Sequence, residues 1–348
     1  MGPSGWKESG TAMFRPWAKA ACALWIGAGL VGAQDPTVFR TDVKLVHVIA
    51  TVKNRAGEPV GTLAKDDFAI ADNGVPQEVA FMQRKTEQPL SIALLLDTSG
   101  STSKELKYEL DCGSRFLKAL LAEGNPEDSV GLYDFAYDVN VHSYTHSFNN
   151  LDRYLKDLDR LTRSPHPELG TSLWDAIYFS SRELEQRGGR KVIIVVTDGG
   201  DTTSHYNLHE ALKAAQMADA VVYPVVVMPI TSDAGRNTGG EHSLIFMAQG
   251  TGGRSFMPTS GPELDRTFDS IITELRTQYV LGFYPKGVPL TKDPFHKLDV
   301  RVKSPELQVS ARNGYYGDAE GSTPDARVTV NPDRPAPPAP KKKSNQEN

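Results

Sequence analysis

Residues 92–101 read Ile92-Ala93-Leu94-Leu95-Leu96-Asp97-Thr98-Ser99-Gly100-Ser101, an apolar run that changes abruptly into polar side chains. Two more short apolar runs, at residues 192–196 and 221–227, have the same character. Continuous apolar runs of this length are typical of strands that are buried on both faces, as in a parallel sheet covered by helices. The sequence therefore predicts a buried parallel sheet, one strand of which ends near Asp97.

Between these runs the apolar residues recur at helical spacing. Strands that alternate with helices indicate a doubly wound, mostly parallel α/β domain. Such a sheet binds its ligands at the carboxyl ends of the strands. The residues at helical spacing are Leu106, Leu110, Leu117 and Leu121, then Leu173, Ile177 and Leu184, then Leu264, Phe268, Ile271 and Leu275.

Oxygen-bearing side chains gather where the predicted strands end or helices begin. They are Asp97, Ser99 and Ser101, then Thr171 in Gly170-Thr171-Ser172-Leu173, and Asp198 in Thr197-Asp198-Gly199-Gly200-Asp201. Hydroxyls and carboxylates without sulfur or imidazole are the ligands of a hard, octahedral cation such as Mg²⁺. The alternative is that these are ordinary capping serines and turn aspartates.

This three-part pattern resembles the metal-ion-dependent adhesion site (MIDAS) of von Willebrand factor type A (vWA) domains. That site combines Asp-x-Ser-x-Ser, a distant Thr and an Asp in a Thr-Asp-Gly turn, and the resemblance covers roughly residues 88–275. It implies that Ser99, Ser101 and Thr171 contact the cation directly or through water, while Asp97 and Asp198 act largely through bound water. It also implies an open coordination position for an Asp or Glu of a partner protein. The expected ion is Mg²⁺, with Mn²⁺ and Ca²⁺ as alternatives.

The segments on either side of this domain read as β-structure. Residues 36–87 and 277–316 contain turn signals and alternating apolar residues but no helical period. Two or three isolated strands are marginally stable, so we expect both segments to form one small β-sandwich into which the α/β domain is inserted. Leu298, Val300 and Val302 would supply one apolar face, and Val43, Leu45 and Ile49 the opposing one.

The flanking segments also resemble a family of exported bacterial VWFA-related proteins, which extends the resemblance to about residues 38–317. The similar stretches are Lys65-Asp66-Asp67-Phe68, Asp72-Asn73-Gly74, residues 279–284 and Asn313-Gly314-Tyr315-Tyr316. This family implies a fold and an export route, without a settled biochemical role.

The first 33 residues have the order of a secretory signal. Basic residues precede a charge-free run at residues 20–33, which ends in Val31-Gly32-Ala33; a short uncleaved anchor is the alternative. We expect a signal peptide at 1–33, sandwich halves at 34–87 and 277–317, the vWA domain at 88–276, and a disordered tail rich in Pro and Lys at 318–348. The mature protein would be secreted or periplasmic, without a transmembrane anchor, and Cys112 would be its single cysteine.

The net charge and the absence of certain motifs narrow the range of functions that the sequence predicts. A net charge of −5 without a basic stripe gives no basis for nucleic-acid binding. Residues 170–174 lack the last glycine of a Gly-x-Ser-x-Gly nucleophile turn, and no nucleotide-binding Gly-x-x-x-x-Gly-Lys-Ser/Thr loop occurs. We expect an exported, non-enzymatic, adhesion-type module. A metal-dependent hydrolase and a structural envelope protein are the alternatives.

Other polar residues carry weaker signals. Asp134 and Asp201 could lie near the predicted site, and Asp175 is expected to order the start of its helix. His205 and His209 have i, i+4 spacing that suits zinc, although a solvated helix face is the favoured interpretation.

Overall fold

The computed structural model describes residues 45–84, 88–100, 106–162, 170–227 and 237–317. All of them lie in one compact unit, Val43–Asn348. The predicted signal peptide and the predicted tail lie outside the described residues. None of the helices in the described residues is both long and apolar enough to cross a membrane.

A five-stranded sheet in the order β7-β6-β5-β8-β9 forms the centre of the α/β domain. Strands β5, β6, β8 and β9 run parallel, and β7 is an antiparallel edge strand. Every residue of β5 is buried, as its continuous apolar sequence predicts. The bounds are β5 Leu90–Asp97, β6 Ser129–Phe135, β7 Val139–Thr145, β8 Arg190–Thr197 and β9 Ala220–Val226.

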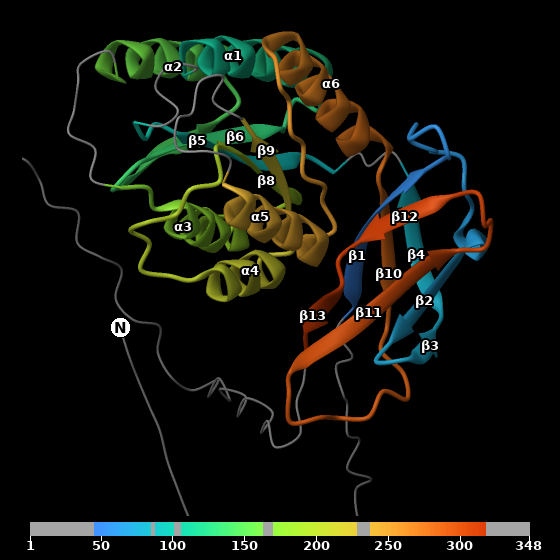
Figure 1. Cartoon of the computed structure of the whole chain (residues 1–348). Helices are drawn as coiled ribbons and strands as arrows, with labels where there is room; N and C mark the ends of the chain where they lie inside the picture. Colours follow the sequence, from blue (N-terminus) through green and yellow to red (C-terminus); the bar gives the residue numbers. More distant parts are fainter. Residues whose placement is uncertain (1–44, 85–87, 101–105, 163–169, 228–236, 318–348) are drawn as a thin grey trace, which may run out of the picture. The chain divides into compact units, whose positions relative to one another are not determined.

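Helices cover both faces of this sheet (Figure 1). Helices α1, α2 and α6 pack on one face, and α3, α4 and α5 pack on the other, each set enclosing its own apolar core. Their bounds are α1 Leu106–Glu123, α2 Phe148–Thr162, α3 Leu173–Glu185, α4 Leu208–Met217, α5 Thr238–Thr251 and α6 Gly261–Thr277. This arrangement confirms the predicted doubly wound α/β fold.

The remaining strands form a sandwich of two four-stranded antiparallel sheets. Their orders are β12-β1-β10-β4 and β13-β11-β2-β3, with a short 3-10 helix at Lys65–Asp67. The bounds are β1 Val46–Lys53, β2 Phe68–Asp72, β3 Val75–Gln77, β4 Val79–Arg84, β10 Tyr279–Phe283, β11 Phe295–Val302, β12 Gln308–Ala311 and β13 Gly314–Tyr316.

Both sheets combine strands from the two ends of the described chain. Strand β1 lies between β10 and β12, with Val48 opposite Leu281 and Val52 opposite Val309. In the second sheet, β2 pairs with β11, placing Ile70 opposite Val300. The prediction of one sandwich built from the N- and C-terminal segments is therefore confirmed.

The prediction of which residues of the first strand face the sandwich core is wrong. Its side chains in the sandwich core are Val46, Val48, Ala50 and Val52, which pack in the same cluster as Leu298. Ile49 points the other way and packs against the core of the α/β domain. Leu45 is half-buried before the strand begins, and Val43 lies outside the described residues. Both faces of β1 carry apolar residues because both are covered, so alternation alone does not identify the inner one.

A polar junction ties the sandwich to the α/β domain. Gln278, the single residue between α6 and β10, donates hydrogen bonds to Thr51 Oγ1 at 3.1 Å and to the Tyr223 hydroxyl at 2.7 Å. Lys53 Nζ lies 2.5 Å from Glu274 Oε2 of α6. Buried polar groups that are satisfied in this way fix a unique packing arrangement.

Candidate metal centre

Asp97 ends β5 at the carboxyl edge of the sheet and is fully buried. Its Oδ1 accepts a hydrogen bond from the Ser99 backbone N–H at 2.9 Å. Its Oδ2 accepts one from Thr197 Oγ1, on the adjacent strand β8, at 2.6 Å. Both of these donors are neutral groups that orient the carboxylate.

Burial is the main influence on Asp97, and it raises the pKa of this carboxyl to about 6. Hydrogen bonds from Ser99 and Thr197 lower the pKa, whereas the negative charge of Asp198 raises it. Two carboxylates therefore interact at this edge of the sheet in a buried setting. The donor set fits a divalent cation, whose charge would offset the cost of ionising Asp97.

Thr171 is held close to the end of β6 by its neighbours. The Ser172 backbone N–H donates to the Ala136 carbonyl at 2.7 Å, directly after β6. Thr98, next to Asp97, donates its backbone N–H to the Phe135 carbonyl at 2.9 Å. The segments that carry Asp97 and Thr171 are thus tied to adjacent residues at the same sheet edge.

Gly170 is required for this arrangement. Its φ is +151°, and a Cβ at this position would lie 2.3 Å from Thr203 Cγ2. The Thr171 backbone N–H donates to Thr202 Oγ1 at 2.8 Å, and the Thr171 carbonyl accepts from the Thr202 N–H at 2.9 Å. The loop after β8 therefore holds the Thr171 backbone from both sides.

Asp198 begins the turn that follows β8. Its Oδ1 accepts a hydrogen bond from the Gly200 N–H at 2.9 Å, and its side chain is half-buried. Gly199 has a φ of +86° and donates its N–H to Thr197 Oγ1 at 3.1 Å. Asn237 Nδ2 donates to the Gly199 carbonyl at 3.1 Å, which fixes the turn against the residues before α5.

Four of the five predicted ligands, Asp97, Ser99, Thr171 and Asp198, lie in the described segments, and Ser101 lies outside the described residues. Coordination by this set stays a prediction. Within the described ranges, His, Cys, Asp and Glu side chains form no group of three or more that could hold a metal. A cation at this edge would therefore depend on the hydroxyl groups as well as on the two carboxylates.

Sequence reasoning missed the residues that position the candidate ligands. Thr197 bridges Asp97 and the Asp198 turn, and Thr202 fixes the backbone of Thr171. Ser204 Oγ accepts a hydrogen bond from the Trp174 N–H at 3.0 Å at the start of α3. The signal was the cluster of hydroxyl residues Thr202-Thr203-Ser204 directly after the Asp198 turn.

The polar residues with weaker sequence signals, Asp134, Asp175 and Asp201, form hydrogen bonds that fix nearby loops and a helix start. Asp134 accepts a hydrogen bond from Asn140 at 2.9 Å, and Asp201 accepts one from the Trp174 N–H at 3.3 Å. Asp175 accepts from the backbone N–H groups of His205 at 2.8 Å and of Tyr206 at 2.9 Å.

The interpretation of the two histidines as one helix face is wrong. His205 lies in the loop before α4, where its ring contacts Asp175 at 2.9 Å, whereas His209 lies in α4 itself. The i, i+4 spacing therefore does not correspond to two side chains on one turn of a helix.

Several solved structures are similar to this chain at low sequence identity. An aerotolerance-related membrane protein from Bacteroides fragilis is 20% identical over 53% of this chain and 98% of its own, with a TM-score of 0.38. The vWF domain of the type V pili tip protein Mfa5 from Porphyromonas gingivalis is 14% identical over 54% and 95%, with a TM-score of 0.43. Proximal thread matrix protein 1 from the mussel byssus, with a zinc-occupied MIDAS motif, is 15% identical over 55% of this chain, with a TM-score of 0.43. The match spans 48% of that mussel protein.

Family membership rests on a separate comparison. No match was found among curated proteins. The model of the von Willebrand factor type A domain matches residues 91–269, which is just over half of the 348 residues. The matched range begins at the second residue of β5 and includes β6 to β9 and helices α1 to α5. The chain belongs to the von Willebrand factor type A domain family.

Proposed function

We propose that the chain is a non-enzymatic, adhesion-type protein-binding module that recognises a partner carboxylate through a divalent cation. The ligands would be Asp97, Ser99, Ser101, Thr171 and Asp198. The observation that supports this most is the buried Asp97, a carboxylate oriented by Ser99 and Thr197 and influenced by the charge of a second carboxylate, Asp198. Mg²⁺ is the expected ion, with Mn²⁺ and Ca²⁺ as alternatives.

The chemistry follows from the donor set. Two carboxylates offset the charge of the cation, while neutral hydroxyls in direct contact leave it electrophilic. An Asp or Glu of the partner would complete the coordination. The side chain of Asp198 is half-buried, which supports access of a partner to this edge of the sheet. A charge-assisted contact of this kind is directional and does not require a large buried area.

We also propose the export route and the domain boundaries. Residues 1–33 would be removed as a signal peptide, so the mature chain would begin near Gln34 and be secreted or periplasmic. Residues 34–87 and 277–317 would be the two halves of the sandwich, and 88–276 the inserted domain. Mass spectrometry of protein from the native host tests the cleavage. An intact N-terminus in a cytoplasmic fraction would contradict it.

Partner capture tests the binding role. The mature chain is immobilised and exposed to an envelope and culture-medium extract of its host, in Mg²⁺ or in EDTA. The wild type and the control Asp201→Asn should retain a partner in Mg²⁺ and release it in EDTA. Thr171→Val, which removes the hydroxyl but keeps the shape, should not retain it. Asp201 is a suitable control because it lies in the same loop but bonds to the Trp174 backbone.

The captured partner is then tested in a second experiment for the carboxylate that binds the cation. Replacing its acidic residues one at a time with Asn or Gln should identify one position whose loss abolishes metal-dependent capture. Capture that is equally strong in EDTA, or equally strong with Thr171→Val, would contradict recognition through a cation.

A further inference from the structure

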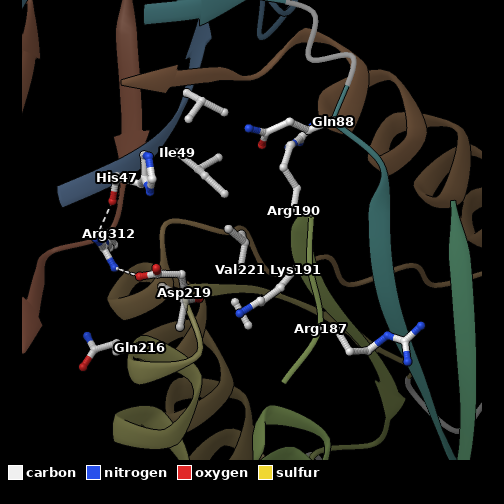
Figure 2. Close-up of a pocket in the computed structure, with 14 residues that line it drawn as sticks. His47, Ile49, Gln88, Arg187, Arg190, Lys191, Gln216, Asp219, Val221 and Arg312 are labelled. Atoms are coloured by element: carbon white, nitrogen blue, oxygen red, sulfur yellow. Dashed lines mark hydrogen bonds and ion pairs between the residues drawn. The ribbon is translucent and has the colours of Figure 1, made fainter. Parts of the chain in front are cut away.

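A cavity of about 250 Å³ lies at the amino-terminal edge of the parallel sheet (Figure 2). The candidate metal centre lies at the other, carboxyl-terminal edge. The starts of β8 and β9 line it on one side, and β1, β10 and Arg312 line it on the other. This volume is below the roughly 300–1,000 Å³ of pockets for drug-sized ligands. The space therefore suits a small ligand with a few water molecules.

Four cationic side chains line this cavity, against one carboxylate. Arg187, Arg190 and Lys191 come from the segment Arg187-Gly188-Gly189-Arg190-Lys191 at the start of β8, and Arg312 comes from the sandwich. The carboxylate belongs to Asp219, which already forms an ion pair with Arg312. The lining of the cavity therefore carries more positive than negative charge.

Lys191 extends from β8 toward Asp219 (Figure 2). Its Nζ donates one long hydrogen bond, 3.3 Å, to the neutral carbonyl of Glu185. Among the described residues, no carboxylate lies within ion-pair distance of this ammonium. Burial lowers the pKa of Lys191, and the charges of Asp219 and Glu185 oppose that effect. Lys191 is therefore a partly buried cation without a matching anion in contact.

Arg312 reaches the cavity from the sandwich. Its two terminal nitrogens donate to Asp219 Oδ1 and to the His47 carbonyl, and Nε is the third nitrogen of the guanidinium. This Nε is buried and has no hydrogen-bond partner in the described part of the chain. A buried donor without an acceptor is costly, so an acceptor in this cavity would be favoured.

The other two arginines add positive potential. Arg190 is buried, and its terminal nitrogens bond to the neutral Leu275 carbonyl, at 2.8 Å, and to Gln278 Oε1. Burial lowers the pKa of Arg190 to about 10, so it stays charged at neutral pH. Arg187 extends away from Lys191, contacting Ser129 Oγ at 3.2 Å and the Tyr144 ring at 3.9 Å. A cavity lined by one sign of charge attracts counter-ions.

We propose that this cavity binds a small multivalent oxyanion of the phosphate class, with Lys191 and Arg312 as its contacts from the two sides. A phosphate group offers several strong acceptors to cationic donors and suits the excess of positive charge. The ligand would be inorganic phosphate or a small phosphate monoester. Because it would touch both the α/β domain and the sandwich, its binding would stabilise their junction.

Calorimetric titration of the mature chain tests this proposal in EDTA, which removes the cation from the candidate metal centre. Inorganic phosphate and glycerol 3-phosphate are titrated separately, and the tighter of the two identifies the source of the phosphate group. The wild type should show one saturable site. Lys191→Gln should bind about tenfold more weakly, which is the scale of one charge-assisted contact. Lys191→Arg should retain binding.

Lys118→Gln is the matched control, since Lys118 is an exposed lysine of α1 that does not line the cavity. It should bind phosphate like the wild type. Thermal unfolding gives a second readout that a merely structural lysine would not produce. Without phosphate, Lys191→Gln should unfold at the wild-type temperature or above, because the substitution removes one of several positive charges that repel one another around the cavity. With phosphate, the wild type should gain stability and the variant should gain less.

Two outcomes would overturn the proposal. One is the absence of saturable phosphate binding by the wild type. The other is equal phosphate affinity in the wild type and in a folded Lys191→Gln. Because the titration is done without divalent metal, its failure would leave the proposed metal-dependent function untouched.

Discussion

Thr197 Oγ1 donates a 2.6 Å hydrogen bond to Asp97 Oδ2 and accepts a 3.1 Å hydrogen bond from the Gly199 N–H. One hydroxyl thus joins the end of β5 to the turn that carries Asp198. Its donor and acceptor are both used, so the side chain has a single satisfied orientation. Thr197 therefore positions two of the proposed ligand segments relative to each other.

Thr197→Val should weaken Mn²⁺ binding about 10- to 100-fold, the usual effect of losing a residue that orients a metal ligand. Valine keeps the shape of the side chain but leaves the Asp97 carboxylate and the Gly199 N–H without this partner. Titration calorimetry measures the affinity, and circular dichroism checks the fold. Thr273→Val on the exposed face of α6 is the control, since its hydroxyl bonds only to the Asp269 carbonyl. Unchanged affinity in Thr197→Val would show that Thr197 does not position the site.

Gly170→Ala should destabilise the folded protein by on the order of 1–3 kcal/mol. The new Cβ would meet Thr203 Cγ2 at 2.3 Å, and the φ of +151° is unfavourable for alanine. The same change should displace Thr171 and weaken metal binding. Gly61→Ala is the matched control, because a Cβ there meets nothing within 4 Å. Denaturant unfolding of both variants measures the difference, and equal stability would contradict the argument.

The sequence predicted the parts of the fold that depend on continuous or periodic apolar patterns. The buried strand at β5 and the helices at α1, α3 and α6 follow directly from such patterns. It also predicted which segments share a sheet edge, because the carboxyl ends of parallel strands lie together. The negative charge of Asp198 acts on Asp97 there for this reason.

Other features depend on tertiary contacts that no local pattern records. Val48 and Ile49 are both apolar, and only the packing shows that one faces the sandwich core and the other the α/β core. The roles of Thr197 and Thr202 depend on hydrogen bonds between segments about 100 and 31 residues apart. The cationic cavity joins the start of β8 to Arg312, which is more than 120 residues later in the chain.

Truncation tests the shared sandwich. Deleting residues 277–348 removes both neighbours of β1, which are β10 and β12, and also removes β11, the partner of β2. The strands between residues 46 and 84 should then become sensitive to protease. Deleting only residues 318–348 is the control and should change little. Full protection of the N-terminal strands after the larger deletion would mean that the two segments are separate units.

Cys112 should react slowly with thiol reagents in the folded protein. Its side chain is buried in α1, and burial raises the pKa of the thiol to about 11. Because the thiolate is the reactive form, the labelling rate of the folded chain at pH 8 should be far below that of the unfolded chain and should rise toward pH 11. The chain beginning at Gln34 has this single cysteine, so one rate is measured. Complete labelling of the folded protein within seconds at pH 7 would contradict the burial of Cys112.

Calorimetric titration of Mg²⁺ and of Mn²⁺ into the metal-free mature chain tests the central claim most directly. The wild type and Asp201→Asn should each bind one divalent ion. Asp97→Asn and the double variant Ser99→Ala/Ser101→Ala should lose that binding while retaining the wild-type circular dichroism spectrum. Equal ion affinity in the wild type and in a folded Asp97→Asn would contradict the metal centre, and with it the proposed recognition of a partner carboxylate.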